Sequence, residues 1–503
     1  MNLQELITGT PCRLLAGQND MEVTGLSSDS RKVTEGGAFV CISGTVSDGH
    51  KYLPDVIAKG AKVLFVEKSI AELQREGFLP GSGDDAEELA GLTILQITSG
   101  RTALAALSAA WFRHPADELT TIGVTGTKGK TTTTYMIREM LETAGKKCGL
   151  IGTVEVIIGE KHIPAVNTTP ESYLVQQYFR EMVDAGITHV VMEVSSQALM
   201  LSRVDGFTFD YGVFTNIEPD HIGPNEHTDF NQYLACKKRL FSQCRKGFFN
   251  ADADHLSEMT DGVTCEVAYF GQKKNAGPAL DYAAADPELF ADGGSLGVRY
   301  QLSGKLTGPV TVHMPGGFSV HNSLAAICVA HSCGVTLEEI NRALETVRVN
   351  GRVELMPVSD HFSVIIDYAH NAMGLESLLT TLKAYHPKRL VCLFGCGGNR
   401  DRARRFEMGE VSSKYADLTV VTSDNPRFEE PEAIIEDIIV GVKKADGAYV
   451  VIPDRKEAIE KTIASAEEGD VIVIAGKGHE DYQEIKGVKH HMDDHEMVMA
   501  CKK

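Results

Sequence analysis

The chain has 503 residues, of which 43% are hydrophobic and 23% are charged. This composition is ordinary for a globular protein, and the length suggests about three domains. A formal net charge of −20 argues against a nucleic-acid-binding protein, because binding to phosphate backbones needs excess positive charge. Anionic substrates therefore have to be held by local clusters of cations.

Targeting signals and cysteine usage indicate where the protein works. No apolar run approaches the roughly 20 residues that span a bilayer. The N-terminal residues MNLQELITGT have neither the basic region nor the apolar core of a signal peptide. The eleven cysteines are scattered along the chain, which fits free thiols better than a disulfide framework. We therefore expect a cytoplasmic protein without a membrane span.

The first segment, residues 1–98, predicts a small α/β domain. The apolar runs AFVCIS at 38–43 and KVLFVEK at 62–68 have the length and composition of buried strands. A helical pattern at about 51–59 lies between them.

The second segment, residues 99–345, predicts a larger α/β domain. Ser99 stands where an N-cap is expected for a helix that ends near Trp111. A turn-rich stretch from about 271 to 317 predicts a peripheral antiparallel sheet. Further strands are expected at 119–124, 187–194 and 211–217.

The most informative stretch of the second segment is TGTKGKTT at 125–132. It lies between the strand at 119–124 and a helical pattern at 131–144. A glycine-rich turn in this position points backbone N–H groups at one spot, and the helix N-terminus adds partial positive charge, which together make a cradle for phosphate. Lys130 would reach the terminal phosphates, and the Thr131 hydroxyl could ligate Mg²⁺. The chain is therefore expected to bind a nucleoside triphosphate.

The third segment, residues 346–503, alternates apolar runs with helical patterns. This alternation predicts a doubly wound, mostly parallel sheet. The expected strands are 363–368, 389–395, 417–423, 448–452 and 470–475.

Polar residues follow many of the expected strands, at the sheet edge where ligands bind in open α/β folds. Any one group could be a turn, since Gly, Asn, Asp and Pro are turn residues. Their recurrence at six strand ends indicates binding residues. The groups are EVSS (193–196), Asn216 to His221, DYAH (367–370), GCGGNR (395–400), DNPR (424–427) and GKGHE (476–480).

Three side chains of the second segment each have two interpretations. Glu193 could bind Mg²⁺ through its carboxylate, or it could be a surface carboxylate. His221 could be a second metal ligand or a turn histidine. Lys237 lies in a basic helical stretch, whose default interpretation is a solvated face.

These motifs together resemble the Mur ligases, the ATP-dependent amide-forming enzymes of peptidoglycan precursor synthesis, over nearly the whole chain. Within this family, DNPR and GKGHEDYQ (476–483) are similar to the members that add the third residue of the stem peptide. The resemblance implies a UDP-binding domain at 1–98, a phosphate-loop ATP-binding domain at 99–345 and a Rossmann-like amino-acid-binding domain at 346–503. Further matching pieces are Asp29 to Arg31, Asn167 to Pro170, Lys237 between Tyr233 and Leu240-Phe241, Asn322, and Gly351 to Glu354.

The resemblance implies a reaction with ATP and Mg²⁺ as cofactors. ATP would phosphorylate the free carboxylate of UDP-N-acetylmuramoyl-L-alanyl-D-glutamate, and an amino acid would then attack the acyl phosphate. Because two anions must approach each other, charge neutralisation should dominate catalysis. Lys237 matches the carbamylated lysine (N6-carboxylysine) of the family, an anionic metal ligand.

The residues that the resemblance assigns to catalysis are Lys130, Glu193, His221 and Lys237, and those assigned to the metal are Thr131, Glu193, His221 and Lys237. The ATP-binding residues would be Gly126, Thr127, Lys128, Gly129, Lys130, Thr131, Thr132, Asn322, Arg352 and Asp367. Ser30 would contact the UDP moiety, and Thr168, Thr169, Ser195 and Arg203 would contact the muramoyl-dipeptide.

The incoming amino acid is expected to be meso-diaminopimelate. Family members that add it carry an arginine at the end of DNP-x, as Arg427 is here. Diaminopimelate has a second carboxylate where lysine has none, and a planar guanidinium can grip it bidentately. Glu480 suits the distal ammonium. The expected contacts are Arg400, Asp424, Asn425, Pro426, Arg427, Gly476 and Glu480.

Alternative functions remain open. The same ligase could add L-lysine or another diamino acid. A related ligase could act on a folate or a poly-amino acid, since Asn371 is a feature in which the chain is similar to the folylpolyglutamate synthases. The first domain, with Asp29 to Arg31, argues against that function. A non-catalytic nucleotide-binding regulator is a candidate from a different class. The chain's catalytic and metal positions are intact, which argues against that regulator: Lys130, Thr131, Glu193, His221 and Lys237. We expect a monomer with small-molecule substrates only.

Overall fold

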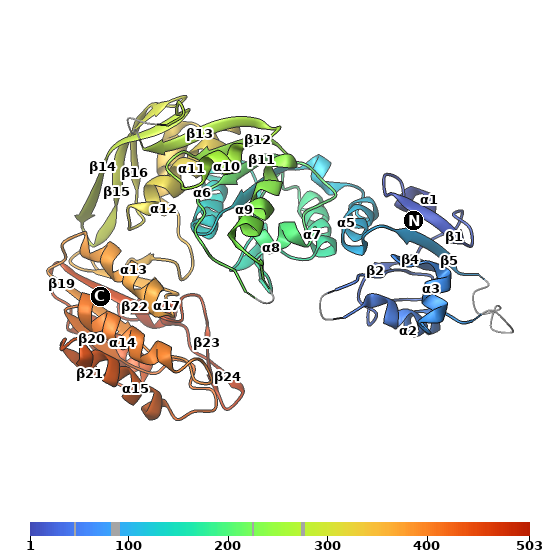
Figure 1. The fold of residues 1–503 in the computed structure, drawn as a ribbon. Helices are drawn as coiled ribbons and strands as arrows, with labels where there is room; N and C mark the ends of the chain where they lie inside the picture. Colours follow the sequence, from blue (N-terminus) through green and yellow to red (C-terminus); the bar gives the residue numbers. More distant parts are fainter. Residues whose placement is uncertain (45–46, 82–90, 224–225, 273–276, 503) are drawn as a thin grey trace. The chain divides into compact units, whose positions relative to one another are not determined.

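The structure, a computed structural model, describes residues 1–44, 47–81, 91–223, 226–272 and 277–502. Across these residues it contains three sheets flanked by helices and one two-stranded hairpin (Figure 1). The chain divides into two compact units. The first comprises Met1–Lys130, Gly145–Phe249 and Ala253–Ala268, and the second comprises Thr131–Ala144, Asn250–Asp252 and Tyr269–Lys503.

The first sheet has five strands in the order β1-β5-β4-β3-β2. Strands β2 to β5 are parallel, and β1 is antiparallel to β5. Val63 and Phe65 of β4 enter one apolar core, and Leu64 and Val66 enter another, so both faces of the sheet are covered. The strands are β1 (Cys12–Ala16), β2 (Leu26–Ser27), β3 (Ala38–Val40), β4 (Val63–Val66) and β5 (Thr93–Ile97); the helices are α1 (Leu3–Leu6), η1 (Gly49–Tyr52), α2 (Leu53–Ala58) and α3 (Ile70–Arg75).

The largest sheet has eleven strands in the order β16-β15-β14-β13-β12-β11-β6-β10-β7-β8-β9. Strand β6 lies between β10 and β11 and is parallel to both. The carboxyl ends of these three strands therefore meet at one edge. The strands are β6 (Thr120–Thr125), β7 (Cys148–Ile151), β8 (Glu155–Ile158), β9 (Lys161–Pro164), β10 (His189–Glu193), β11 (Phe209–Phe214), β12 (Cys244–Asn250), β13 (Glu266–Gln272), β14 (Tyr282–Asp292), β15 (Ser295–Gly304) and β16 (Gly308–Val312).

Strands β14, β15 and β16 pair antiparallel. The antiparallel sheet predicted for the turn-rich stretch is thereby confirmed, as the outer part of the largest sheet; residues 273–276 of that stretch lie outside the described residues. The predicted cap is confirmed as well, because the Ser99 side chain accepts a hydrogen bond from the backbone N–H of Thr102 at the start of α5. The helices of this part are α5 (Gly100–Trp111), η2 (Pro115–Glu118), α6 (Lys130–Thr143), α7 (Ser172–Asp184), α8 (Ser196–Met200), α9 (Phe230–Lys238), η3 (Arg239–Ser242), α10 (Leu256–Thr260), α11 (Phe318–Ser332) and α12 (Leu337–Thr346).

The third sheet has six strands in the order β17-β18-β22-β19-β20-β21. Only the β17–β18 pair is antiparallel. Alternate residues of β22 enter two apolar cores, which include side chains of α13 to α15 and of α16 and α17 respectively, so the doubly wound arrangement is confirmed. The strands are β17 (Glu354–Met356), β18 (Ser363–Asp367), β19 (Arg389–Phe394), β20 (Leu418–Val421), β21 (Tyr449–Val451) and β22 (Asp470–Ala475); the helices are α13 (Ala372–Lys383), α14 (Ala403–Tyr415), α15 (Pro431–Lys444), α16 (Arg455–Ala464) and α17 (Asp494–Met499).

A hairpin follows β22 and consists of β23 (Tyr482–Ile485) and β24 (Val488–His491), which pair antiparallel. Among the residues that the structure describes, no helix has both the length and the apolar character needed to cross a membrane.

Candidate active site

The glycine-rich turn connects β6 to α6 in the order that the sequence predicts. Gly126 has a φ of +154°, and a Cβ at this position would lie 1.9 Å from the Thr215 hydroxyl oxygen. Gly129 has a φ of +83°, a conformation that favours glycine. The backbone conformation therefore requires glycine at both positions, and a side chain on Gly126 would clash with Thr215.

Asn216, which follows β11, holds the turn through two hydrogen bonds. Its backbone carbonyl accepts from the N–H of Thr127 at 3.0 Å, and its side-chain oxygen accepts from the N–H of Lys128 at 2.9 Å. The Lys130 ammonium donates to the carbonyls of Gly126 and Thr127 at 2.9 and 3.1 Å. Helix α6 begins at Lys130, so the N–H groups of its first turn have no partner within the helix. This arrangement fits a phosphate group.

Lys237 does not lie on a solvated face, and that default interpretation is wrong. Its residue is only 1% exposed. Its ammonium donates to the Gly126 carbonyl at 2.8 Å and lies 4.5 Å from the centre of the Tyr233 ring. Burial, together with the nearby Lys130 cation, lowers the pKa of Lys237 well below its usual value. A buried amine with a lowered pKa therefore lies directly behind the phosphate turn.

Glu193 ends β10 and is 1% exposed, which excludes a surface carboxylate. Its two carboxylate oxygens accept hydrogen bonds from the backbone N–H and the hydroxyl of Thr153, at 2.8 and 3.0 Å. The Thr153 hydroxyl also lies 3.1 Å from that of Thr168. Thr153 was not expected from the sequence, because it lies in a short turn before β8 with no motif around it.

The predicted muramoyl-dipeptide residues are brought together beside Glu193. The Thr169 hydroxyl donates to the Glu193 carbonyl at 2.8 Å and accepts from the backbone N–H of Ser195 at 3.1 Å. The Arg203 guanidinium donates to the Thr169 carbonyl at 3.0 Å and pairs with Glu171 at 2.7 Å. One cation and several hydroxyl groups thus cluster at this edge of the sheet, which suits an anionic, polyhydroxylated ligand.

His221 lies beside Tyr233, with the two ring centres 6.2 Å apart, and it also faces two carboxylates. Its side chain is 56% exposed, and its ring lies 3.0 Å from the Glu226 carboxylate and 3.7 Å from that of Asp220. Within the described ranges, no group of three or more His, Cys, Asp or Glu side chains could hold a metal ion. The oxygen donors of Thr131 and Glu193 are of the type that Mg²⁺ prefers.

The remaining predicted residues of the first two segments lie in two places. Ser30 follows Asp29, whose carboxylate accepts from the backbone N–H of Arg31 at 3.0 Å, and the Ser30 carbonyl accepts from Lys59 at 2.7 Å. Asn322 is 5% exposed on α11.

Asp367 ends a strand of the third sheet, and Arg352 lies close to it in the segment that precedes β17. Asp367 ends β18, and its carboxylate accepts from the backbone N–H groups of Val353 and Ala369 at 2.7 and 2.8 Å. Burial raises the pKa of Asp367. The Arg352 guanidinium lies 5.0 Å from the centre of the Tyr368 ring.

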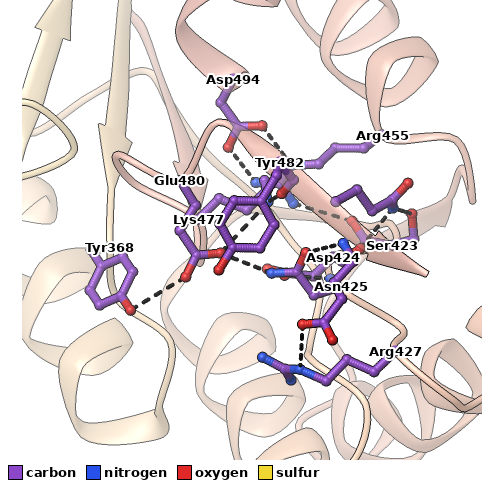
Figure 2. Close-up of polar contacts among 12 residues, drawn as sticks. Tyr368, Ser423, Asp424, Asn425, Arg427, Arg455, Lys477, Glu480, Tyr482 and Asp494 are labelled. Carbon is purple, nitrogen blue, oxygen red and sulfur yellow. Dashed lines mark hydrogen bonds and ion pairs between the residues drawn. The ribbon is translucent and has the colours of Figure 1, made fainter. Parts of the chain in front are cut away.

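A cavity of about 290 Å³ lies at the carboxyl ends of β18, β19, β20 and β22. Asn425 donates to the Glu480 carboxylate at 2.8 Å, and the Tyr368 hydroxyl lies 3.5 Å from it (Figure 2). Arg427 and Glu480 both line this cavity, so a cation and a carboxylate are available to one ligand. Six of the seven residues predicted to contact the amino acid line it, namely Arg400, Asp424, Asn425, Arg427, Gly476 and Glu480; Pro426 does not.

Several residues around this cavity were not expected from the sequence. Arg455 and Asp494 are fully buried and pair through two contacts of 2.7 and 2.6 Å (Figure 2). Arg455 also donates to the carbonyls of Ser423 and Ala475, which directly precede Asp424 and Gly476. No motif marks this pair, because Arg455 looks like an ordinary residue of a helical first turn. Arg404 and Arg405 also line the cavity. Tyr368 lines it as well, and it belongs to the DYAH group that the sequence predicted.

Known proteins match the chain along its length. Three family models match it: "Mur ligase family, catalytic domain" over residues 22–111, "Mur ligase middle domain" over 124–330, and "Mur ligase, glutamate ligase domain" over 351–478. The UDP-N-acetylmuramoyl-L-alanyl-D-glutamate--2,6-diaminopimelate ligase of Clostridium perfringens (strain 13 / Type A) is 38% identical over 505 residues, which cover 99% of each chain.

Two solved structures are similar in fold. A UDP-N-acetylmuramoyl-L-alanyl-D-glutamate--2,6-diaminopimelate ligase matches with a TM-score of 0.74 and 28% identity, over 100% of this chain and 98% of that one. The folylpolyglutamate synthase of Mycobacterium tuberculosis matches with a TM-score of 0.53 and 17% identity, over 73% of this chain and 91% of that one, and shows the fold alone. The predicted three-domain α/β fold and the family resemblance are thus confirmed. The chain belongs to the Mur ligase family.

Proposed function

We propose that this chain joins meso-diaminopimelate to UDP-N-acetylmuramoyl-L-alanyl-D-glutamate in an ATP-dependent step of peptidoglycan precursor synthesis. The observation that carries the proposal is the cavity of about 290 Å³ lined by both Arg427 and Glu480. An amino acid with a second carboxylate and a second ammonium group is complementary to such a pair. The full-length relatives at 38% identity, which carry this activity in their names, support the same substrate.

Two chemical steps make the amide bond. The γ-phosphoryl group of ATP passes to the free carboxylate of the dipeptide, which yields an acyl phosphate and ADP. The amino group of diaminopimelate then attacks the acyl carbon; the C–N bond forms, the C–O bond to phosphate breaks, and a proton leaves the nitrogen. The first step brings two anions together, so its barrier is lowered chiefly by positive charge at the phosphates.

The phosphate turn supplies that charge. The first turn of α6 and the Lys130 ammonium would bind the triphosphate, with Gly126, Thr127, Lys128, Gly129, Thr131 and Thr132 forming the cradle. Mg²⁺, when bound, would neutralise charge between the phosphates and the acceptor carboxylate, held by the oxygen atoms of Thr131 and Glu193. Asn322, Arg352 and Asp367 would contact the rest of the nucleotide.

Lys237 would serve as a carbamate. A neutral amine adds to CO₂ with loss of one proton, and the product carries two oxygen atoms and a negative charge. The lowered pKa of the buried Lys237 amine supports this modification, because only the unprotonated amine reacts. A carbamate behind the phosphate turn would add an oxygen ligand for Mg²⁺. His221 is the remaining proposed metal residue, and it would have to leave Glu226 to take that role.

The dipeptide substrate would lie along the cluster beside Glu193. The hydroxyls of Thr168, Thr169 and Ser195 can donate to its carbonyl and carboxylate oxygens, and Arg203 can neutralise a carboxylate. Ser30 would contact the UDP moiety. These roles divide the chain into a UDP-binding domain at 1–98, an ATP-binding domain at 99–345 and an amino-acid-binding domain at 346–503.

We propose that the protein works in the cytoplasm as a monomer. None of the eleven cysteines, all of which lie in the described residues, is in a disulfide, which supports a reducing compartment. Size-exclusion chromatography with light scattering checks the oligomeric state.

Phosphate release from ATP tests the proposed reaction. Release should require both the UDP-muramoyl-dipeptide and diaminopimelate, and omission of either substrate should abolish it. A ligase acting on a folate would release phosphate with that acceptor instead, and a non-catalytic regulator would release none with any acceptor. Preference for L-lysine over diaminopimelate would replace the amino acid in the proposal but keep the reaction class.

A further inference from the structure

The hairpin of β23 and β24 carries an acidic side chain, Glu484, that contacts Arg427. Neither residue is deeply buried: the Arg427 and Glu484 side chains are 20% and 24% exposed. The inference that follows rests on the proposed function, because it assigns Arg427 to the distal carboxylate of the incoming amino acid.

The Arg427 backbone is held by the hairpin. Its φ is +53°, a left-handed conformation that costs a non-glycine residue strain. Its N–H donates to the Glu484 carbonyl at 2.9 Å, and its carbonyl accepts from the Lys486 N–H at 2.6 Å. The hairpin thus stabilises a backbone conformation that Arg427 would not prefer alone.

The neighbouring residues of the DNPR turn are tied to the same strand. The Asn425 side-chain oxygen accepts from the backbone N–H of Glu484 at 2.8 Å. The Gln483 side chain donates to the Asp424 carbonyl at 2.7 Å. All of these contacts use the backbone of Glu484 or the side chain of Gln483, so they persist when the Glu484 side chain is changed.

Among the described residues, the hydrogen bond that the Glu484 side chain accepts comes from the Arg427 guanidinium. Arg427 Nε donates to Glu484 Oε2 at 3.3 Å, and Nη1 donates to the Gly398 carbonyl at 2.8 Å. These two acceptors lie on different nitrogens of the planar group, so they hold its orientation. In the part of the chain that the structure describes, Nη2 has no acceptor, and Arg427 lines the cavity. The N–H groups of Nη2 remain for a ligand.

The charges of the cavity leave room for an anion despite Glu484. Four arginines line the cavity, against three carboxylates: Arg400, Arg404, Arg405 and Arg427, and Asp401, Asp424 and Glu480. A guanidinium also has five N–H donors. Glu484 uses one of them and therefore does not saturate the group.

We infer that Glu484 is a positioning residue that determines specificity: it orients the Arg427 guanidinium for the distal carboxylate of diaminopimelate. Without it, the arginine has to be ordered at the moment of binding. L-lysine has no distal carboxylate, so its use does not depend on that orientation.

Kinetics of Glu484 variants test this role. Glu484→Ala should raise the KM for diaminopimelate about tenfold, the loss expected when a long side chain must be ordered on binding. The KM values for ATP and the UDP-substrate should stay within about twofold, as should kcat/KM for L-lysine. Glu484→Gln should restore the wild-type KM, because its amide oxygen still accepts from Nε. Glu484→Asp keeps the charge but retracts the acceptor, so its KM should also rise.

A matched control is Glu496→Gln, which removes a carboxylate that lies 2.8 Å from His491 of the same hairpin and should behave as wild type. The inference is overturned if Glu484→Ala and Glu484→Asp both keep the wild-type KM for diaminopimelate, or if the KM values for all three substrates rise together. Failure of the proposed function looks different: the wild-type protein itself would then not use diaminopimelate.

Discussion

Replacement of Arg427 is the sharpest test of how the amino acid is chosen. Arg427→Ala removes the guanidinium of a residue that lines the same cavity as Glu480. Hydrogen bonds to charged groups contribute about 1.5–3 kcal/mol. At about 1.4 kcal/mol for each factor of ten, kcat/KM for diaminopimelate should fall about 10- to 150-fold, whereas kcat/KM for L-lysine should not fall.

The same substitution should cost little stability. The Arg427–Glu484 pair is 20% and 24% exposed, so the remaining carboxylate can be hydrated, and the loss should be about 0–1 kcal/mol. Arg427→Gly distinguishes the loss of the side chain from strain in the backbone, since glycine accepts a φ of +53° without strain. It should show the same kinetic loss as the alanine variant.

Phosphate release measured at varied amino-acid concentration gives both values of kcat/KM in one assay. Arg427→Lys should be intermediate, because it keeps the charge but loses the planar donor geometry. An equal loss with diaminopimelate and L-lysine, or no loss with either, would refute the assignment of Arg427.

Three further substitutions test other parts of the account. Lys237→Ala should lower turnover by on the order of a hundredfold. In bicarbonate, mass spectrometry of the wild-type protein should show the added mass of one CO₂, and the modified fraction should rise with pH because only the neutral amine reacts; the lowered pKa of Lys237 places this rise at a lower pH than for an ordinary lysine. An unmodified Lys237 at every pH would contradict this. Gly126→Ala would place a Cβ 1.9 Å from the Thr215 hydroxyl oxygen and should weaken ADP binding by roughly tenfold or more. Isothermal titration calorimetry measures this affinity, and an unchanged value would contradict the prediction. Arg455→Ala leaves the buried Asp494 carboxylate unpaired and should lower the free energy of unfolding by about 3–5 kcal/mol, measured by urea denaturation; a change below about 1 kcal/mol would show that the pair is not needed.

Five of the six strands of the third sheet could be predicted from the sequence, because they lie in short apolar runs. Strand β17 (Glu354–Met356), which has only three residues, was not among the expected strands. The expected strand at 470–475 coincides with β22, and every residue of β22 is buried. Strand β9 could not be found in this way, because three of its four residues are exposed. Its sequence, KHIP, has no periodicity and gains its pairing only from β8.

The candidate site was predictable where residues are neighbours in a motif, as in DNPR, and not where the contact joins distant parts of the chain. Burial of Lys237 depends on the Gly126 carbonyl, 111 residues away in sequence. The basic residues around it instead suggested a solvated face. Glu484 was missed for the same reason, because its partner Arg427 is 57 residues away in sequence.

The most direct test of the account is a competition experiment with the wild-type protein. ATP, Mg²⁺ and UDP-N-acetylmuramoyl-L-alanyl-D-glutamate are incubated with equal concentrations of meso-diaminopimelate, L-lysine and L-ornithine, and the products are identified by mass spectrometry. The account predicts that the product consists almost entirely of the diaminopimelate adduct, formed in step with phosphate release. A product that contains mainly lysine or ornithine, or phosphate release without any adduct, would contradict it.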